Sequence, residues 1–159
     1  MERTIPLKDV VKLARRTLKQ AFPTVAFRST YSSRYQPVMS LYWTDGPSDE
    51  EVKDLLKQFI GYEQGFLNIT DVWEVSRLVE GEKIHYDLFN ISRCRFYSRA
   101  FLLPIAETVS ARYRLAVPDI PPDNEWGWTS FDKRNTDRVL PSHTLGEIIM
   151  LEADARSAL

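Results

Sequence analysis

Few residues of this chain are of the types that carry out chemistry. The histidines are His85 and His143, far apart in the sequence, and Cys94 is the single cysteine. His85 and Asp87 alternate within a strand pattern and therefore share one face, but two ligands do not complete a zinc site. We expect no metal site and no cofactor.

Cys94 is the candidate nucleophile. It lies between Arg93 and Arg95, whose charges would favour a reactive thiolate if they lay close to the sulfur. In a strand, neighbouring side chains point to the opposite face, which makes Cys94 a core residue instead. A small enzyme that uses Cys94 or His85 stays open as one hypothesis.

Other catalytic patterns do not occur in the sequence. It contains no phosphate-binding loop, no dinucleotide glycine fingerprint and no nucleophile elbow. Asp45 and Asp71 could form a catalytic pair of carboxylates. Each is better explained by its position in a turn or at a strand edge. We therefore expect that the protein is not an enzyme.

Cationic side chains form the larger pattern. They recur every three or four residues on one side of a helix predicted over residues 6–22, and they alternate with aromatic residues further along. Arginine next to tyrosine can pair with phosphate and stack on bases, whereas an ordinary solvated surface is the competing interpretation. The candidate nucleic-acid contacts are Lys12, Arg15, Arg16, Lys19, Arg28, Arg34, Tyr35, Arg93, Arg95 and Arg99.

Charge is segregated along the chain although the formal net charge is −1. Residues 1–47 hold eight Lys/Arg against three acids, and residues 48–74 hold two against seven. An electrostatic partner must therefore recognise one face of the molecule. Acidic and aromatic residues that would instead meet a protein partner are Asp49, Glu50, Trp126 and Trp128.

The elements that position these residues follow from hydrophobic spacing. The helix over 6–22 is ended by Pro23, and residues 24–31 and 38–43 predict two antiparallel strands. Ser48 and Glu51 predict a capping box before a second helix that ends near Gly61. Further strands are expected within 68–79 and 83–96, joined by a turn over 80–82, and Ser98 caps a third helix that runs to about residue 113.

Together these elements predict an α+β fold. We expect a small antiparallel sheet of about four strands packed by two to three helices, in the order α-β-β-α-β-β-α. The predicted core domain covers residues 1–115. Residues 116–159 form an extended arm, rich in Pro and Trp, whose aromatic residues and short final helix over 144–158 pack on the core.

Composition limits the class of protein. The 159 residues, 43% of them hydrophobic, suit a globular chain with a real core. One cysteine allows no disulfide within the chain and suits a reducing cytoplasm. Because no apolar run approaches the roughly 20 residues of a membrane span, and no signal-peptide pattern opens the chain, we expect a cytoplasmic protein without a membrane partner.

Three segments carry a resemblance to a known family. The first is a helix, Leu7-Lys8-Asp9-Val10-Val11-Lys12-Leu13-Ala14-Arg15 through Ala21-Phe22-Pro23, that leads into Val25-Ala26-Phe27-Arg28. The others are Leu41-Tyr42-Trp43-Thr44-Asp45-Gly46-Pro47 and, before the Ser98 helix, Asp87-Leu88-Phe89-Asn90-Ile91-Ser92-Arg93. In this order they resemble the large polyvalent protein associated domain family numbered twenty-nine, over about residues 5–113. The resemblance implies a setting in phage and plasmid proteins, but it brings no catalytic residues.

Two functional hypotheses follow. The first is a non-catalytic accessory domain of mobile elements that binds nucleic acid or a nucleoprotein complex through the cationic residues. The alternative is a protein-interaction factor, such as an inhibitor of a host defence enzyme or a homo-oligomeric adaptor, which meets its partner through acidic and aromatic residues.

Overall fold

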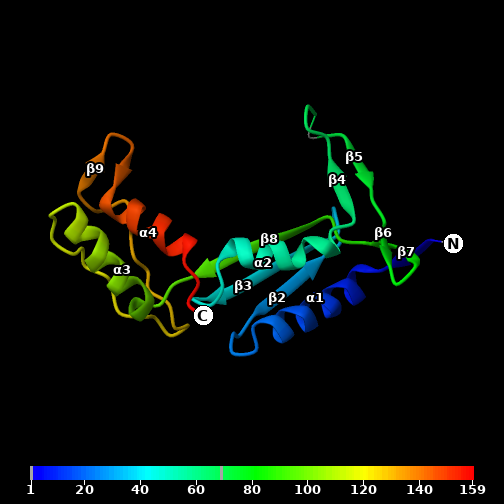
Figure 1. The fold of residues 1–159 in the computed structure, drawn as a ribbon, viewed down its shortest axis with the longest axis horizontal. Helices are drawn as coiled ribbons and strands as arrows, with labels where there is room; N and C mark the ends of the chain where they lie inside the picture. Colours follow the sequence, from blue (N-terminus) through cyan, green and yellow to red (C-terminus); the bar gives the residue numbers. More distant parts are fainter. Residues whose placement is uncertain (1, 69) are drawn as a thin grey trace. The chain divides into compact units, whose positions relative to one another are not determined.

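The structure is a computed structural model that describes residues 2–68 and 70–159, and it is of the α+β class, as predicted (Figure 1). Its helices are α1 (Leu7–Ala21), α2 (Asp49–Leu56), α3 (Arg99–Arg112) and α4 (Leu145–Ala155), and a short 3₁₀ turn, η1 (Lys57–Phe59), follows α2. Its strands are β1 (Glu2–Ile5), β2 (Arg28–Ser32), β3 (Val38–Thr44), β4 (Tyr62–Gln64), β5 (Val72–Glu74), β6 (Arg77–Val79), β7 (Glu82–Tyr86), β8 (Asn90–Phe96), β9 (Arg138–Leu140) and β10 (His143–Thr144).

The predicted order is present, with additional strands. The structure has α1, β2, β3, α2, β8 and α3 where the sequence predicts them, and the predicted turn at Glu80 and Gly81 joins β6 to β7. The strands form separate sheets of two or three strands and not one sheet of about four. Residue 69, inside the strand predicted over 68–79, lies outside the described residues.

Contacts between Cα atoms group the chain into two compact units. The first comprises residues 1–42 and 52–94, and the second comprises residues 43–51 and 95–159. The prediction of a core domain over 1–115 with a packed arm stays a prediction.

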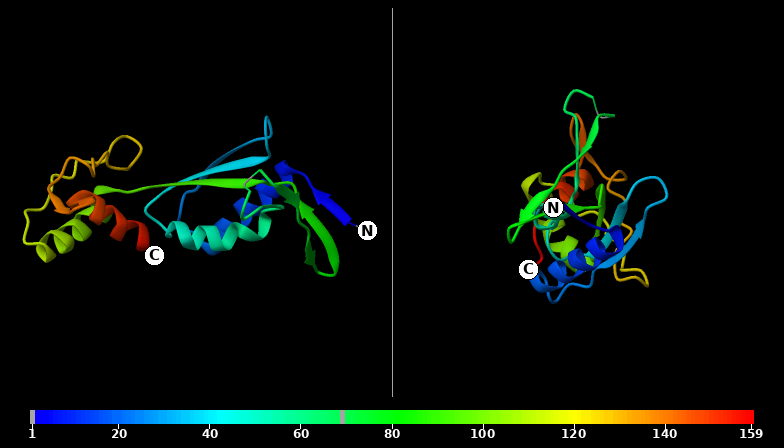
Figure 2. Two further views of the ribbon diagram at one scale, coloured as in Figure 1. Left: turned by 90° about the horizontal axis from the view of Figure 1, so that it is seen from above. Right: turned by 90° about the vertical axis from the view of Figure 1, so that its right-hand side faces the viewer.

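The first unit contains a three-stranded sheet covered on one face. The strand order is β2-β3-β8, and β2 pairs antiparallel with β3 so that Ser29 lies opposite Leu41. Figure 2 shows α1 and α2 on the same side of these strands. Apolar side chains at helical spacing meet the alternating apolar face of β3 there. The buried residues are Val10, Val11, Ala14, Leu18, Met39, Leu41, Val52 and Leu56.

Two smaller sheets complete the first unit. In the order β1-β7-β6, β1 runs parallel to β7 and places Ile5 opposite Tyr86, while β6 and β7 form a hairpin. The β4–β5 hairpin forms a separate two-stranded sheet that projects from the unit (Figure 1).

The second unit has a core between α3 and α4. Leu102, Ile105 and Val109 of α3 are buried with Ile149 of α4 and with Ile120 from the proline-rich segment. Each helix has a side-chain cap at its first turn. Ser98 Oγ accepts the amide of Phe101, and Thr144 and Glu147 form a full capping box before α4.

The Trp43–Pro47 segment forms a tight turn in the second unit. Asp45 and Gly46 both have positive φ, 52° and 55°, which suits Asp and Gly better than branched residues. The Asp45 carboxylate accepts the amide and the hydroxyl of Ser98, at 2.8 and 2.6 Å, and so joins this turn to the start of α3. Ser48 and Glu51 form the predicted capping box directly after the turn.

Arg95 connects that turn to the end of α4. Its guanidinium also lies over the rings of Tyr97 and Phe101, 4.8 and 5.2 Å from their centroids. The end of a helix leaves carbonyl groups without partners, and a cation is favoured there. Arg95 donates to five backbone carbonyl oxygens, those of Asp45 (2.7 Å), Gly46 (3.2 Å), Ala153 (3.1 Å), Asp154 (3.4 Å) and Arg156 (2.7 Å).

Within residues 2–68 and 70–159, no helix combines the length and the apolarity that are needed to cross a bilayer.

Replacing Arg95 by lysine tests this connection. Lysine keeps the charge, but its single nitrogen cannot serve carbonyls on both sides, so Arg95→Lys should lower the free energy of unfolding by about 2–4 kcal/mol. Denaturant unfolding followed by tryptophan fluorescence measures this. The matched control is Arg16→Lys on the exposed side of α1, which should stay within about 0.5 kcal/mol of the parent. Equal stability of both variants would contradict the structural role.

The capping box of α4 predicts a pH dependence. The hydrogen bond from the Thr144 amide lowers the pKa of Glu147 below its usual value. A carboxyl group whose pKa is lower in the folded state stabilises the fold above its unfolded pKa, and this contribution disappears as pH falls through the folded pKa. Glu147→Gln keeps an acceptor but does not titrate, so its melting temperature should fall less between about pH 6 and pH 3. Glu125→Gln, in an exposed loop, should behave like the parent.

Candidate functional site

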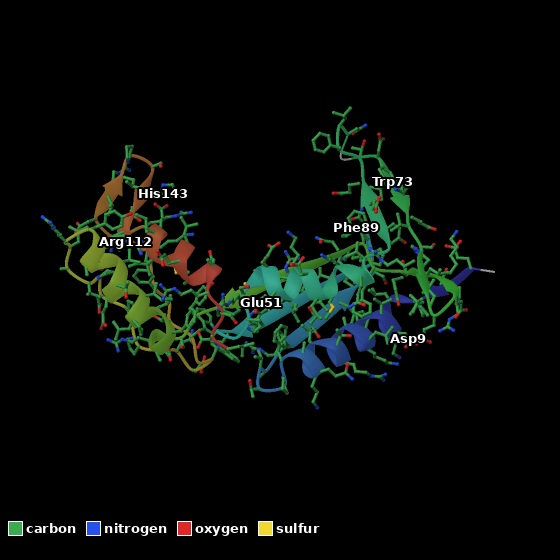
Figure 3. All side chains as sticks on the ribbon, viewed as in Figure 1. Asp9, Glu51, Trp73, Phe89, Arg112 and His143 are labelled. Atoms are coloured by element: carbon green, nitrogen blue, oxygen red, sulfur yellow. The ribbon has the colours of Figure 1, made fainter. Side chains whose placement is uncertain are left out.

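The β4–β5 hairpin presents an apolar tip. Phe66 is 100% exposed and Leu67 is 96% exposed, and we call these two residues the hairpin tip. On the adjoining strand β5, Trp73 is 48% exposed (Figure 3). Isolated exposed apolar residues are common on protein surfaces, but neighbouring large ones on a projecting element are typical of a binding site.

Local hydrogen bonds hold the loop that carries the tip. The amide of Gly65 donates to the carbonyl of Asp71 at 2.7 Å, and the amide of Asp71 donates to the carbonyl of Asn68 at 3.0 Å. The Asn68 side chain accepts both the amide and the hydroxyl of Thr70. A Cβ on Gly65 would lie 2.6 Å from the carbonyl oxygen of Asn68, so this close approach requires glycine. These bonds occupy several polar groups of Gly65, Asn68, Thr70 and Asp71, while Phe66 and Leu67 face solvent.

The base of the hairpin is fixed by a half-buried polar contact. The Tyr62 hydroxyl donates to Asp87 at 2.9 Å, and its ring lies edge-on to that of His85. Burial, together with this hydrogen bond, raises the pKa of Tyr62 to about 12. The Tyr62 ring also packs against Phe89, which Figure 3 labels near the start of the hairpin. The hairpin therefore begins at a well-anchored point.

All charges on the hairpin are negative. Residues 61–76 contain Glu63, Asp71 and Glu74 but no lysine or arginine. An apolar tip among carboxylates repels phosphate and favours a partner that offers an apolar pocket with cations around it.

A groove with the complementary character lies in the same unit, between α2 with its following turn and β8. We call it the α2–β8 groove. Its volume is about 200 Å³, and none of its lining residues is acidic. The lining residues are Lys53, Leu56, Lys57, Ile60, Asn90, Ile91 and Arg93. The groove runs beside an edge strand, because β8 is the last strand in the order β2-β3-β8.

The structure does not gather the predicted cations of the first unit into one surface. Figure 2 shows the β2–β3 turn, which carries Arg34 and Tyr35, on the side of the sheet away from α1. On α1, Lys12 pairs with Asp9 and Arg15 donates to Ser29. Also on α1, Arg16 and Lys19 are exposed.

The remaining cations of the first unit have separate positions. Arg28 is exposed on the edge strand β2, and Tyr35 is 88% exposed with Arg34 against its ring. Arg93 is half-buried in the α2–β8 groove and donates to the carbonyl of Ile91.

Two predicted nucleic-acid contacts of the second unit have internal roles. The five carbonyl oxygens that Arg95 contacts match the five N–H groups of a guanidinium, which leaves none for a phosphate. Arg95 thus serves contacts within the second unit, and its role as a nucleic-acid contact stays a prediction. Arg99 donates from Nε to the carbonyl of Ile120 at 2.9 Å and is exposed.

Two of the residues predicted to contact a protein partner are half-buried, and the other two are exposed. Trp128 stacks on Phe96, with ring centroids 4.7 Å apart, and is half-buried. Trp126 is exposed. In the first turn of α2, Asp49 is half-buried and Glu50 is exposed, where negative charge favours the helix.

The residues suggested as catalytic are buried or half-buried within the fold. His85 is buried, and its Nδ1 lies 3.0 Å from the carbonyl of Val75, so this nitrogen carries the proton. Cys94 is half-buried in β8. In the described parts of the chain, no three His, Cys, Asp or Glu residues gather as a metal site would require.

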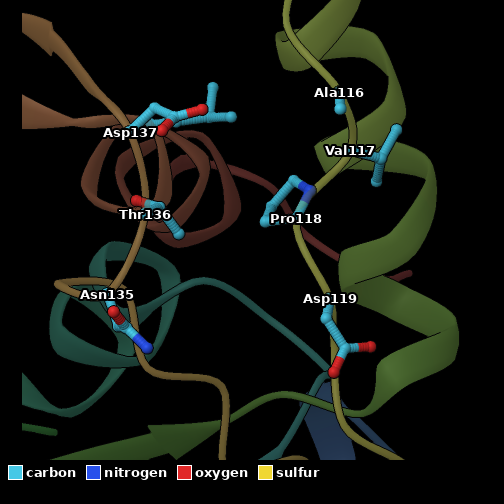
Figure 4. Close-up of a pocket in the computed structure, with 8 residues that line it drawn as sticks. Ala116, Val117, Pro118, Asp119, Asn135, Thr136 and Asp137 are labelled. Carbon is cyan, nitrogen blue, oxygen red and sulfur yellow. The ribbon is translucent and has the colours of Figure 1, made fainter.

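A polar cavity in the second unit gives no reactive arrangement (Figure 4). Its volume is about 380 Å³, and its walls include Asp119, Asn135 and Asp137. Figure 4 shows Asp119 and Asp137 on opposite walls, carried by separate segments. The hydroxyl of Thr136 accepts the amide of Gly146 and donates to the carbonyl of Lys133, so it serves the fold.

Sequence reasoning missed the hairpin tip and the groove. A signal for the tip was present, because Phe66 and Leu67 stand between Gly65 and Asn68, where turn residues are expected and apolar ones are not. The groove gave no such signal, since α2 and β8 contribute residues that are about 35 positions apart in the sequence.

A comparison with protein families shows the family to which the chain belongs. The profile of the family Large polyvalent protein associated domain 29 matches residues 5–98, which is more than half of the 159 residues. The chain belongs to this family, as the sequence segments predicted, although the match ends at the cap of α3 and not near residue 113. A search of curated proteins and a search of solved structures each gave no match.

Proposed function

We propose that this chain is a non-catalytic accessory domain of mobile-element proteins that binds another protein through its hairpin tip. The observation that carries the proposal is the full exposure of Phe66 and Leu67 at the end of an anchored hairpin. Membership of the family supports the mobile-element setting.

The energetics favour a binding role for the tip. Burying a Phe or Leu side chain contributes roughly 1.5–3 kcal/mol each. Because hydrogen bonds of Gly65, Asn68, Thr70 and Asp71 already restrain the loop, it loses less conformational entropy when a partner covers it. A preorganised apolar projection of this kind suits a pocket on a protein.

The charges support a protein and not a polyanion as the partner. Glu63, Asp71 and Glu74 flank the tip, and the hairpin has no cation to meet phosphates or acidic lipid headgroups. Polar groups around an apolar centre are the arrangement found in protein–protein interfaces.

The surroundings of the reactive residues support a non-catalytic role. His85 supports the base of the hairpin, and Cys94 is half-buried within a strand. Neither lines the α2–β8 groove or the polar cavity of the second unit.

Nucleic-acid binding is the second candidate, and the exposed side of α1 is what favours it. Lys8, Arg16 and Lys19 are exposed there beside Lys12 and Arg15. A single cationic helix face would bind phosphates weakly and without sequence preference.

A photo-crosslinker in place of Phe66 tests the main proposal. Introduced into cells that carry the mobile element, p-benzoylphenylalanine at position 66 should crosslink to a defined protein, because this side chain is buried in the complex. Gel shifts and mass spectrometry identify the product. Leu67→Ser in the same chain should reduce the yield.

The matched control places the same group at Tyr35, an equally exposed aromatic position in the β2–β3 turn. It should give no specific protein product. Equal products from both positions, or crosslinks from position 66 to nucleic acid alone, would overturn the proposal.

Charge reversal on α1 tests the second candidate. If α1 binds phosphates, Arg16→Glu with Lys19→Glu should abolish a mobility shift with DNA or RNA that the parent gives at about 50 mM salt. Arg99→Glu with Arg134→Glu, at two exposed positions of the second unit, serves as the control with the same change of charge. Absence of any shift with the parent protein would remove nucleic acid as a ligand.

A further inference from the structure

We infer that the hairpin tip of one copy docks into the α2–β8 groove of another copy of this chain. This inference rests on the proposed function and names the partner.

The groove has room for the tip. Its volume is about 200 Å³, whereas a cavity of roughly 150 Å³ in an engineered protein core takes up benzene. The ring of Phe66 therefore fits, with Leu67 placed at the rim. Leu56 and Ile91 are buried and form part of an apolar floor.

The charges of the two surfaces are opposite. Lys53, Lys57 and Arg93 lie around the groove, and Glu63, Asp71 and Glu74 lie around the tip. Lys57 pairs with Asp54 at 3.0 Å, but both side chains are largely exposed, and such a pair contributes little and exchanges partners readily. A docked carboxylate from another copy can thus meet a lysine without breaking a buried contact.

The edge of β8 adds a backbone component. An edge strand presents N–H and C=O groups to which an extended segment can add, as in other peptide-binding domains. The tip loop enters beside this edge when Phe66 occupies the groove. Main-chain pairing would then supplement the apolar and ionic contacts.

Tip and groove are different surfaces of the same unit, so each copy offers one of each. The contact therefore forms either twice between two copies related by a two-fold axis, or once per copy in a head-to-tail chain. In both arrangements, a copy without its tip still offers a groove, and a copy without its groove still offers a tip. Two complementary variants therefore test the inference.

The tip variant carries Phe66→Ser with Leu67→Ser, and the groove variant carries Lys53→Glu with Lys57→Glu. Light scattering after size exclusion, over a range of protein concentrations, should show self-association of the parent chain. Each variant alone should associate at least about a hundredfold more weakly. An equal mixture should form a dimer and nothing larger, because the intact groove of the tip variant accepts the intact tip of the groove variant.

Two controls address surface charge and exposed aromatics in general. Tyr35→Ser and Lys8→Glu with Lys12→Glu change exposed residues away from both surfaces and should associate like the parent. Denaturant unfolding should confirm that all variants are folded.

The outcomes separate this inference from the proposed function. A parent chain that stays monomeric at several hundred micromolar, or a mixture of the two variants that stays monomeric, would overturn the tip-in-groove contact. If position 66 still crosslinks to a different protein, only the identity of the partner is wrong. If it crosslinks to no protein, both proposals fail.

Discussion

The bonds of the Arg95 guanidinium are the interaction on which the second unit depends. They join the carbonyls of the Asp45-Gly46 turn to those at the end of α4, two segments that no strand or helix connects. Without these donors, each carbonyl group would lose a hydrogen bond, although those of Gly46 and Ala153 would keep the amides of Ala158 and Arg156. The stacked rings of Tyr97 and Phe101 would also lose their cation. A lysine at this position could not reach both sides.

The most specific part of the family signature, Leu41–Pro47, contains the turn that Arg95 binds. Trp43 donates its indole N–H to the carbonyl of Pro47, and Asp45 holds the first turn of α3. The signature segment Asp87–Arg93 behaves similarly, because backbone groups of Asp87 and Phe89 bond to those of Ile5 and Pro37. Both segments therefore serve folding, whereas the hairpin tip, Phe66 and Leu67, lies outside them and is exposed. A resemblance based on such segments identifies an architecture and leaves the ligand open.

Local features were predictable from the sequence, and long-range ones were not. The amphipathic spacing of α1, the Ser48–Glu51 capping box and the Ser98 cap depend on residues a few positions apart, and all are present. The parallel pairing of β1 with β7 joins segments that are about 80 residues apart, and a strand of four residues has too little pattern to reveal it. Arg95 looked like a surface cation, because no local pattern shows that distant carbonyls surround it. The hairpin tip departs from the expectation that turns are polar. Such departures from local rules are expected at functional sites.

The second unit is discontinuous in the sequence, because its Trp43–Glu51 segment lies between the two parts of the first unit and its remainder follows them. On a ribosome the turn emerges early and must wait for the residues that complete it, the last of which are Arg156 and Ala158. Contacts of such large sequence separation slow folding. The first unit can thus become compact during synthesis, while the second becomes compact only after Arg156 and Ala158 have left the exit tunnel.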